Sequence, residues 1–377
     1  MSVFPQVPDE APFMAVLSEL RTAISEDLRP RIHDIDVNGW YPEPFMRRVG
    51  ALGGFSQSVP AAYGGGGRGL PYTLHVMEEV ARDCLSTGFC VWCQTVCAWY
   101  VQNSDNDVLK RDLLPQVATG RVLAGTGLSN PMKHFAGIEK IRITAEQRPG
   151  GYRLNGALPW VSNVGEGHVF AAVARVADTE DYLMAVMPGD LPGITLGDGG
   201  HFIALEGSST RSAIFKDVFL PDRLVLAAPC HDYLARIRPG FILGQTGFGL
   251  GLVSSCLDLM RRSNERVGHV NCFLEDGVEE IEDALEKTRR RVYPLAEAIG
   301  CGGRDLGPEA TREAVEARAL TSELALRASQ AAMLHAGAGG YRQGSAAERK
   351  LREAYFVAIV TPALKHLKKM LHDFGSV

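Results

Sequence analysis

Along roughly the first 120 residues, apolar side chains recur every three or four positions, as they do on one face of an amphipathic helix. This spacing is clear in residues 11–32, APFMAVLSELRTAISEDLRPRI, and again in residues 70–84, LPYTLHVMEEVARDC. Between them, residues 59–69 read VPAAYGGGGRG, a glycine-rich stretch that predicts a loop. The pattern predicts an N-terminal helical domain, residues 1–122.

Near Leu123 the pattern changes to alternating apolar and polar positions, which is typical of strands. Residues 138–163, IEKIRITAEQRPGGYRLNGALPWVSN, contain a turn at Pro149 to Gly151 and predict a hairpin. Residues 168–190 and 212–226 predict further short strands. A β-sheet domain is therefore expected over residues 123–229.

After the sheet domain the helical period returns in long amphipathic runs. These runs are residues 244–267, 278–299 and 308–337, and they predict a C-terminal helical bundle over residues 230–377. The glycines between Gly244 and Gly251 suggest that neighbouring backbones pack closely there. Helices, then a sheet, then helices indicate the α+β class rather than βαβ alternation. No G-x-G-x-x-G follows a strand, and there is no P-loop.

Composition and charge set few further limits. The chain has 377 residues and a net charge of −5, which gives no reason to expect nucleic acid or an anionic membrane as a partner. The N-terminal sequence has no basic stretch followed by an apolar run, so we expect neither a signal peptide nor a transmembrane segment. The expected location is the cytoplasm.

Three cysteines, Cys90, Cys93 and Cys97, are spaced so that their sulfurs lie on one helical face. A metal or iron–sulfur site is one interpretation, but no fourth ligand with metal-site spacing follows. The segment FCVWCQTVCAWYV is apolar, and free cysteine packs as a small hydrophobe. The sequence favours a buried helix face and no metal.

Several local motifs occur in an order and at spacings similar to those of the acyl-CoA dehydrogenase superfamily. They are VPAAYGGGG followed by MEEVAR, then GGYRLNGALPWVSN, SAIFKDVFLPDRLVL and GAGGYRQGSAAERKLREA, and together they cover essentially the whole chain. The resemblance implies an N-terminal helical domain, a barrel-like middle β-sheet domain and a C-terminal helical bundle. It also implies an FAD-dependent oxidoreductase, a flavoprotein that forms a homodimer or homotetramer in which FAD contacts two chains.

The resemblance assigns flavin contacts to four residues. Trp160, in PWVSN, would pack against the isoalloxazine, and Ser162 would hydrogen-bond near N5. Leu128 and Ser129, at a Ser-Asn-Pro stretch that stands where the family has Thr-Glu-Pro, would contact the isoalloxazine edge. The alternative for PWVSN is a core tryptophan and a surface serine.

Two further residues match positions that serve the rest of the FAD. Arg266 matches the arginine that binds the pyrophosphate of the partner chain's FAD, and its alternative is a solvated arginine at a helix end. Gly337 matches a glycine turn, which is also consistent with a helix C-cap. The residues after Pro131, MKHFAG, lack the family's serine, so Lys133 or His134 would replace a phosphate contact, or the segment is an ordinary loop.

The catalytic base is the main departure from the family. Thr361 occupies the position where most members carry a glutamate, and a threonine hydroxyl is not a general base near neutral pH. His366 lies five residues further on, roughly 140° away around a continuous helix, so it is not expected to serve. The sequence thus predicts no catalytic residue and poor dehydrogenation of simple straight-chain acyl-CoA substrates.

Three functions remain open. The first is oxidation of the Cα–Cβ bond of an acyl thioester, with hydride transfer to flavin N5 and an electron-acceptor flavoprotein as partner. The second is a flavin-dependent monooxygenase of the same superfamily, which uses reduced flavin and O₂. The third is a redox-silent relative that binds a ligand or a partner protein.

Overall fold

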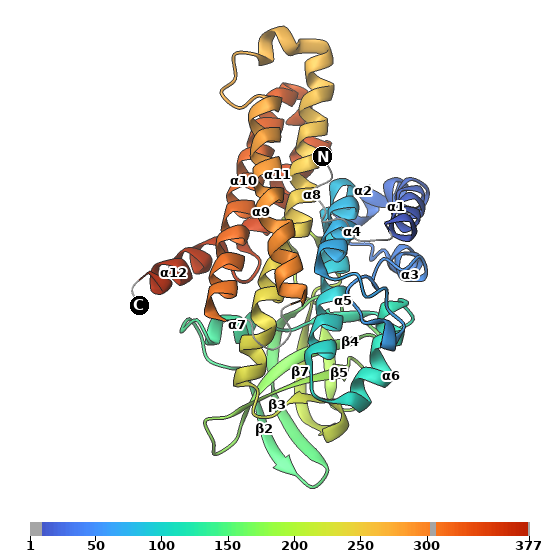
Figure 1. Cartoon of the computed structure of the whole chain (residues 1–377), viewed down its shortest axis with the longest axis vertical. Coiled ribbons are helices and arrows are strands. Elements are labelled where there is room, and N and C mark those ends of the chain that lie inside the picture. Colours follow the sequence, from blue (N-terminus) through green and yellow to red (C-terminus); the bar gives the residue numbers. More distant parts are fainter. Residues whose placement is uncertain (1–9, 302–306, 376–377) are drawn as a thin grey trace.

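The computed structural model describes residues 10–301 and 307–375 of the 377. The molecule is elongated, with the strands gathered at one end and the long C-terminal helices extending to the other (Figure 1). The N-terminal helices pack along one side of this assembly. The order of helices, sheet and helices is that expected from the apolar pattern.

The N-terminal part is helical. Its α-helices are α1 (Ala11–Ala23), α2 (Ile32–Val37), α3 (Glu43–Ala51), α4 (Leu70–Asp83), α5 (Leu85–Asn103) and α6 (Asp107–Ala118). Short π and 3₁₀ turns, η1 (Ile24–Leu28), η2 (Arg29–Arg31) and η3 (Ala61–Tyr63), connect some of them. Helix α6 is capped by Asn106, whose side chain accepts a hydrogen bond from the Leu109 amide at 3.0 Å, a common N-cap arrangement.

Helix α5 is the central helix of this part. Its residues from Leu85 to Val101 are buried, and Cys90, Cys93 and Cys97 have no exposed surface. Burial raises the pKa of the Cys97 thiol to about 12, so this thiol stays protonated at neutral pH. The prediction of a buried helix face is confirmed. Among the described residues no group of three or more metal-ligating side chains is placed to hold an ion.

The eight strands form one mixed sheet in the order β6-β7-β3-β2-β4-β5-β8, with β1 parallel to β4. They are β1 (Ala124–Thr126), β2 (Ile143–Arg148), β3 (Gly151–Val161), β4 (Val169–Val176), β5 (Tyr182–Pro188), β6 (Ile194–Gly197), β7 (Arg211–Pro221) and β8 (Val225–Ala227). The short helix α7 (Ser129–His134) and the turns η4 (Glu206–Ser208) and η5 (Asp222–Leu224) interrupt them. No pairing joins β6 to β8 among the described strands, so the middle domain is one mixed sheet between the two helical parts, as the resemblance implied.

The hairpin expected at Pro149 to Gly151 is present. Strands β2 and β3 pair antiparallel, with Arg148 opposite Gly151, so only two residues form the turn. Gly150 has a φ of 79°, a left-handed conformation that glycine adopts without steric cost. The hairpin carries β3 back toward the C-terminal helices, and Trp160 lies near its end.

The C-terminal part contains α8 (His231–Asn271), α9 (Val278–Cys301), α10 (Pro308–Gly340), α11 (Ala346–Ile359) and α12 (Leu364–Phe374). Helix α8 is long and apolar enough to pass a test for a membrane span, but 94% of its most apolar window is buried inside the molecule. Burial of this kind is typical of a core helix. Its glycines allow close packing, since a Cβ at Gly251 would lie 2.4 Å from the carbonyl oxygen of Glu78 on α4.

The chain does not continue as one helix from α11 into α12. Helix α11 ends at Ile359, and α12 begins at Leu364, so Thr361 and Pro362 lie in the connection. Proline at 362 favours this end because its ring disfavours helical geometry in the residue before it. The assumption of one continuous helix, which placed His366 away from Thr361, is therefore wrong.

Candidate active site

A cavity of about 840 Å³ lies between the sheet and the C-terminal helices. Strand β3 contributes Trp160, helix α5 contributes Phe89 and Trp92, and helix α8 contributes Phe241. The connection between α11 and α12 closes another side with Thr361 and the residues around it. Its volume is within the usual range for a small-molecule site, and most of its wall is apolar.

Trp160 is the prominent aromatic group of the sheet side. Its side chain is 45% exposed, although it belongs to a strand of the central sheet. The Nζ atom of Lys133 lies 5.4 Å from the centre of a Trp160 ring, in a cation–π arrangement. The indole thus faces the cavity rather than a packed core, and a flat aromatic ligand could lie against it.

Hydroxyl groups lie close to Trp160 on the same side. Ser162 accepts a hydrogen bond from the hydroxyl of Thr210 at 3.0 Å. The backbones of Thr126 and Ser162 exchange two hydrogen bonds of 3.2 Å, which fixes β1 beside the end of β3. Both Ser162 and Thr126 line the cavity, so two fixed hydroxyl groups are available to a polar ligand edge.

Thr361 faces Ser129 across the cavity wall. Their hydroxyl oxygens are 3.0 Å apart, which joins α7 to the α11–α12 connection. The Gln245 amide donates to the carbonyl oxygen of Thr361 at 2.9 Å, and the guanidinium of Arg318 donates to Gln245 at 3.0 Å. Burial lowers the pKa of Arg318 to about 9, so its guanidinium remains protonated at neutral pH. This chain of contacts holds Thr361 in place.

Among the described residues, five titratable side chains line the cavity: Lys133, Glu139, Arg352, Lys365 and His366. Glu139 is the one carboxylate, and it lies 3.4 Å from Lys133 and 3.3 Å from Arg142. Burial alone would raise the pKa of Glu139, but a hydrogen bond with Asn130 and the charges of Lys133 and Arg142 lower it. Burial also lowers the pKa of His366, and Lys365 and Lys133 act in the same direction.

Two residues considered from the sequence lie outside the cavity wall. The Leu128 side chain has no exposed surface and belongs to the core, which leaves only its backbone for a ligand contact. His134 has both ring nitrogens engaged, at 3.0 Å from the carbonyl oxygen of Glu139 and 2.9 Å from the Tyr182 hydroxyl. Of the two proposed substitutes for a phosphate contact, Lys133 is the one that faces the cavity.

Arg266 lies near the C-terminal end of α8 and Gly337 near the C-terminal end of α10, and neither residue lines the cavity. Arg266 follows cavity-lining Phe241 by 25 positions along α8, which at about 1.5 Å per residue corresponds to roughly 38 Å. The Ser263 side chain bonds to the backbone of His335, so the ends of α8 and α10 are joined. Gly337 has a φ of 58° where α10 kinks, a conformation that favours glycine.

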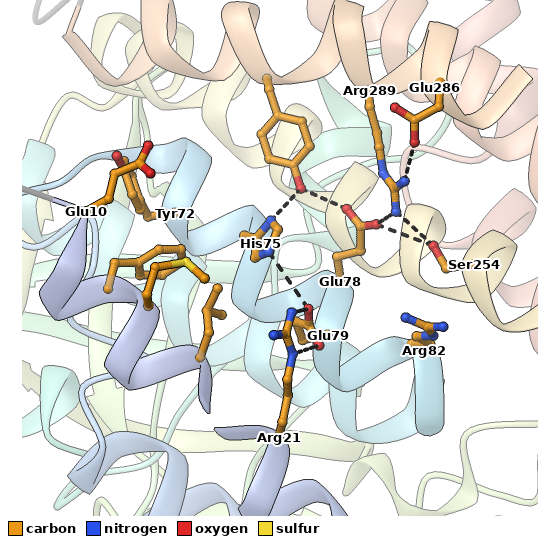
Figure 2. A pocket seen from close by; sticks show the side chains of 14 residues that line it. Glu10, Arg21, Tyr72, His75, Glu78, Glu79, Arg82, Ser254, Glu286 and Arg289 are labelled. Atoms are coloured by element: carbon orange, nitrogen blue, oxygen red, sulfur yellow. Dashed lines mark hydrogen bonds and ion pairs between the residues drawn. The ribbon is translucent and has the colours of Figure 1, made fainter. Parts of the chain in front are cut away.

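A second cavity, of about 400 Å³, lies between α1, α4, α8 and α9 (Figure 2). Many of the polar side chains in its wall bond to one another. Glu78 accepts hydrogen bonds from Arg289, Ser254 and Tyr293, and Arg21 pairs with Glu79. Burial lowers the pKa of the nearby His75. Because Glu78 on α4 bonds to Arg289 and Tyr293 on α9, the network joins these two helices.

Residues 14–121 match the family described as "Acyl-CoA dehydrogenase, N-terminal domain". Over nearly its whole length the chain is similar to curated acyl-CoA dehydrogenases. It is 26% identical over 349 residues to the probable acyl-CoA dehydrogenase YngJ of Bacillus subtilis, covering 89% of this chain and 90% of that protein. It is 24% identical over 359 residues to the human mitochondrial short-chain specific acyl-CoA dehydrogenase, covering 91% and 85%.

The N-terminal part of the chain thus matches this family, and nearly the whole chain is similar to acyl-CoA dehydrogenases. It is an acyl-CoA dehydrogenase-like oxidoreductase, and the resemblance inferred from its motifs is confirmed at this level. The catalytic role of individual residues remains a prediction.

Solved structures share the acyl-CoA dehydrogenase fold. A glutaryl-coenzyme A dehydrogenase in complex with glutaryl-CoA has a TM-score of 0.87 at 21% identity, over 98% of this chain and 96% of that one. A glutaryl-CoA dehydrogenase from Mycobacterium smegmatis in complex with FADH2 has a TM-score of 0.82 at 16% identity, over 98% and 94%. A structure described as an electron transferring flavoprotein of Acidaminococcus fermentans has a TM-score of 0.86 at 19% identity, over 99% and 98%. The Mycobacterium smegmatis structure thus holds the reduced form of FAD.

The residues of the cavity fit the isoalloxazine part of FAD. The exposed indole of Trp160 offers a flat apolar face, and the hydroxyls of Thr126, Ser129 and Ser162 lie around it. Lys133 is a cation in the wall of the same cavity, whereas Arg266 and Gly337 are not part of that wall.

Sequence reasoning missed two features of this acyl-CoA dehydrogenase-like site. His366 was set aside by an argument that required a continuous helix, and Thr210 was not considered. The signal for His366 was already present in the Thr361-Pro362 step, because a proline marks a probable helix end. No local signal pointed to Thr210, which reaches Ser162 through the pairing of β3 with β7.

Proposed function

We propose that this protein is an FAD-dependent oxidoreductase that oxidises the Cα–Cβ bond of an acyl thioester. The observation that carries the proposal is the cavity in which Trp160 and the hydroxyls of Ser162 and Ser129 face an apolar wall. That wall includes Phe89, which packs edge-on against Phe356 at 4.7 Å between ring centres. An apolar wall opposite a polar flavin edge suits an acyl chain.

The bound FAD supplies the acceptor for the hydride that leaves the β-carbon. The chain's own residues bind the flavin and the acyl chain and orient them. Trp160 packs against the flat ring system, and Ser162 donates a hydrogen bond near N5, which favours the reduced form. Phe89 and Trp92 exclude water from the acyl chain. Thr361 and Ser129 fix the edge of the cavity where the thioester enters.

A second subunit completes the cofactor site in this proposal. The end of the bundle that carries Arg266 also exposes large apolar side chains. They are Val267, Val270, Phe273, Leu334 and Tyr341, and Phe273 and Tyr341 are each 86% exposed. A cluster of this kind marks a surface that a partner covers. We therefore propose a homodimer or homotetramer in which Arg266 of one chain serves the FAD of another.

Replacing Arg266 by alanine is expected to weaken FAD binding by about 1.5–3 kcal/mol, the usual worth of a hydrogen bond to a charged group. The measurement is an FAD titration followed by quenching of flavin fluorescence. Arg262→Ala is the matched control, because Arg262 is also exposed and lies on the same helix four positions earlier. Equal FAD affinities in the two variants, or a monomeric protein in solution, would contradict the proposal that Arg266 of one chain serves the FAD of another.

Anaerobic flavin reduction tests the proposed function directly. The holoenzyme is mixed with a panel of butyryl-, isobutyryl-, octanoyl- and glutaryl-CoA, and the flavin absorbance is followed. We expect at least one thioester to bleach the flavin within seconds, since enzymes of ordinary efficiency turn over at roughly 1–10³ per second. If none of them reduces the flavin, oxidation of an acyl-CoA is not the function.

The second candidate is a flavin-dependent monooxygenase. Thr361 favours it, because the cavity wall there carries a hydroxyl held by Ser129 instead of a carboxylate. In that case chemically reduced holoenzyme would consume O₂ and incorporate one oxygen atom into an organic substrate. A protein whose flavin is not bleached by an acyl-CoA and that oxygenates no substrate would be a redox-silent binder.

We further propose a flavoprotein as the electron acceptor of the dehydrogenase, and the cytoplasm as its location.

A further inference from the structure

The α11–α12 connection brings an unassigned titratable group into the candidate active site. We propose that His366 is the general base that removes the α-proton of the acyl thioester. This proposal rests on the proposed function and supplies the residue that Thr361 leaves missing. It identifies a catalytic residue on α12 instead of at the end of α11.

The first argument is position. His366 and Thr361 line the same cavity, because the chain leaves its helix at Ile359 and resumes one at Leu364. The connection turns the first residues of α12 toward the cavity. The His366 amide bonds to the carbonyl oxygen of Ala363 at 2.7 Å, which fixes the residue in the first turn of α12.

His366 shares its cavity with the groups proposed to face the flavin. Lys133, on α7, lines the same cavity, and its Nζ atom lies 5.4 Å from the centre of a ring of Trp160, the residue against which the flavin would pack. A base that acts on the α-carbon must be near both the acyl chain and the flavin, because proton and hydride leave from adjacent carbons.

The second argument is elimination among the groups that line the cavity. Lys133 and Lys365 carry ammonium groups, which donate hydrogen bonds and do not accept them. Arg352 is held by Asp36 at 2.6 Å and also pairs with Glu348. Glu139 is engaged by Lys133 and Arg142, whose charges make its carboxylate a weaker base. His366 is the remaining group with basicity suited to neutral pH.

The electrostatic surroundings keep the imidazole neutral. Burial, followed by the charges of Lys365 and Lys133, lowers the pKa of His366, and Glu139 opposes them. Above its usual value near pH 6.5 the ring is therefore unprotonated and free to accept a proton. Lys365 belongs to α12, Lys133 to α7, and Glu139 to the loop that follows α7, so charged groups face the ring from both packed segments.

In the proposed step a neutral ring nitrogen of His366 accepts the α-proton and the ring becomes imidazolium. The electron pair of the broken C–H bond forms the Cα–Cβ double bond. The β-hydrogen leaves with its own electron pair to the FAD of the proposed function. The thioester is oxidised by two electrons, the flavin is reduced by two, and the proton rests on His366 until solvent removes it.

The test separates proton removal from hydride transfer. In 3-thiaoctanoyl-CoA the β-position is sulfur, so an α-proton can be removed while no β-hydride can follow. Holoenzyme is incubated with this thioester in D₂O, and α-deuteration is measured by mass spectrometry. We expect His366→Gln to slow exchange at least ~100-fold, because general-base catalysis contributes roughly 10²–10⁴-fold. His372→Gln, an exposed histidine on the same helix outside the cavity, is the control and should leave exchange unchanged.

A second readout does not depend on turnover. With ¹³C-labelled histidine, the resonance of His366 is identified by its absence in His366→Gln. Its titration midpoint is expected below 6.5 because burial disfavours the imidazolium. In wild type the exchange rate should rise with pH through this midpoint and then level off.

Equal exchange in His366→Gln and wild type, with FAD bound in both, would overturn the assignment of the base while leaving the proposed function intact. A pH profile of exchange that does not follow the His366 midpoint would overturn it as well. Failure of the wild-type holoenzyme both to bleach with the acyl-CoA panel and to exchange α-protons would overturn the proposed function, and this inference with it.

Discussion

Glu78→Ala is expected to lower the thermal midpoint of the protein by about 4 °C. Glu78 is 6% exposed and accepts hydrogen bonds from Arg289 on α9, Ser254 on α8 and the Tyr293 hydroxyl at 2.7 Å. Breaking a buried ion pair costs about 3–5 kcal/mol. We take about 3, because Arg289 keeps its contact with Glu286 at 2.5 Å. For 377 residues the unfolding entropy is roughly 0.8 kcal/mol per kelvin, which converts this loss to about 4 °C.

The loss of stability arises because Arg289 and Tyr293 each lose a buried partner when Glu78 is replaced. Burial alone lowers the pKa of Arg289, but Glu78 and Glu286 together raise it above its usual value, so the guanidinium depends on them. The Tyr293 hydroxyl would lose its 2.7 Å bond to Glu78 as well and keep only longer contacts such as that to His75 at 3.4 Å. Differential scanning calorimetry of the holoenzyme measures the shift. Glu286→Ala is the control, since this more exposed partner should cost at most about 1 kcal/mol. Equal midpoints for the two variants would show that the network of Figure 2 is not a stabilising feature.

Much of the fold follows from the chain's local pattern. The helical period of residues 70–84 becomes α4, and the Pro-Gly-Gly turn becomes the β2–β3 hairpin, because both depend on neighbours within a few positions. The sheet order could not be read in this way. Strand β3 pairs with β7, about 60 residues away, and β1 lies parallel to β4. Such pairings depend on the packing of the whole sheet, so a short stretch of sequence does not reveal them.

The candidate site was predictable only in part. Trp160, Ser162 and Ser129 were assigned through the resemblance, and the structure brings them to one cavity with Thr361. The buried contact between Glu78 and Arg289 joins residues 211 positions apart, and the bond between Thr361 and Ser129 spans 232. No periodicity connects such pairs, so only the folded chain reveals them.

His366 shows how a local rule can mislead. The helical wheel placed it away from Thr361, while the proline next to Thr361 indicated that the wheel should not be applied there. Once the helix ends at Ile359, position along the chain no longer fixes the direction of a side chain on α12. The expectation of poor dehydrogenation rested on Thr361 and on the exclusion of His366, which we now propose as the base.

The largest expected gain comes from a carboxylate at position 361 in a protein that lacks His366. In His366→Gln, the further change Thr361→Glu is expected to restore α-proton removal by about 10²-fold or more, equivalent to roughly 3 kcal/mol of barrier. Thr361 lines the cavity and its backbone is held by Gln245, so a longer side chain there would enter the same space. The rate of anaerobic flavin reduction by the best thioester of the panel measures the effect.

The matched comparison is Thr361→Gln in the same His366→Gln background. Glutamine has nearly the shape of glutamate but cannot accept the proton, so a recovery seen with both would reflect packing and not base catalysis. In the presence of His366, Thr361→Glu should add little, because one base already serves the α-carbon. Two bases that substitute for one another give strongly non-additive effects in a double-mutant cycle. Additive effects of the two substitutions would mean that positions 361 and 366 do not act on the same proton.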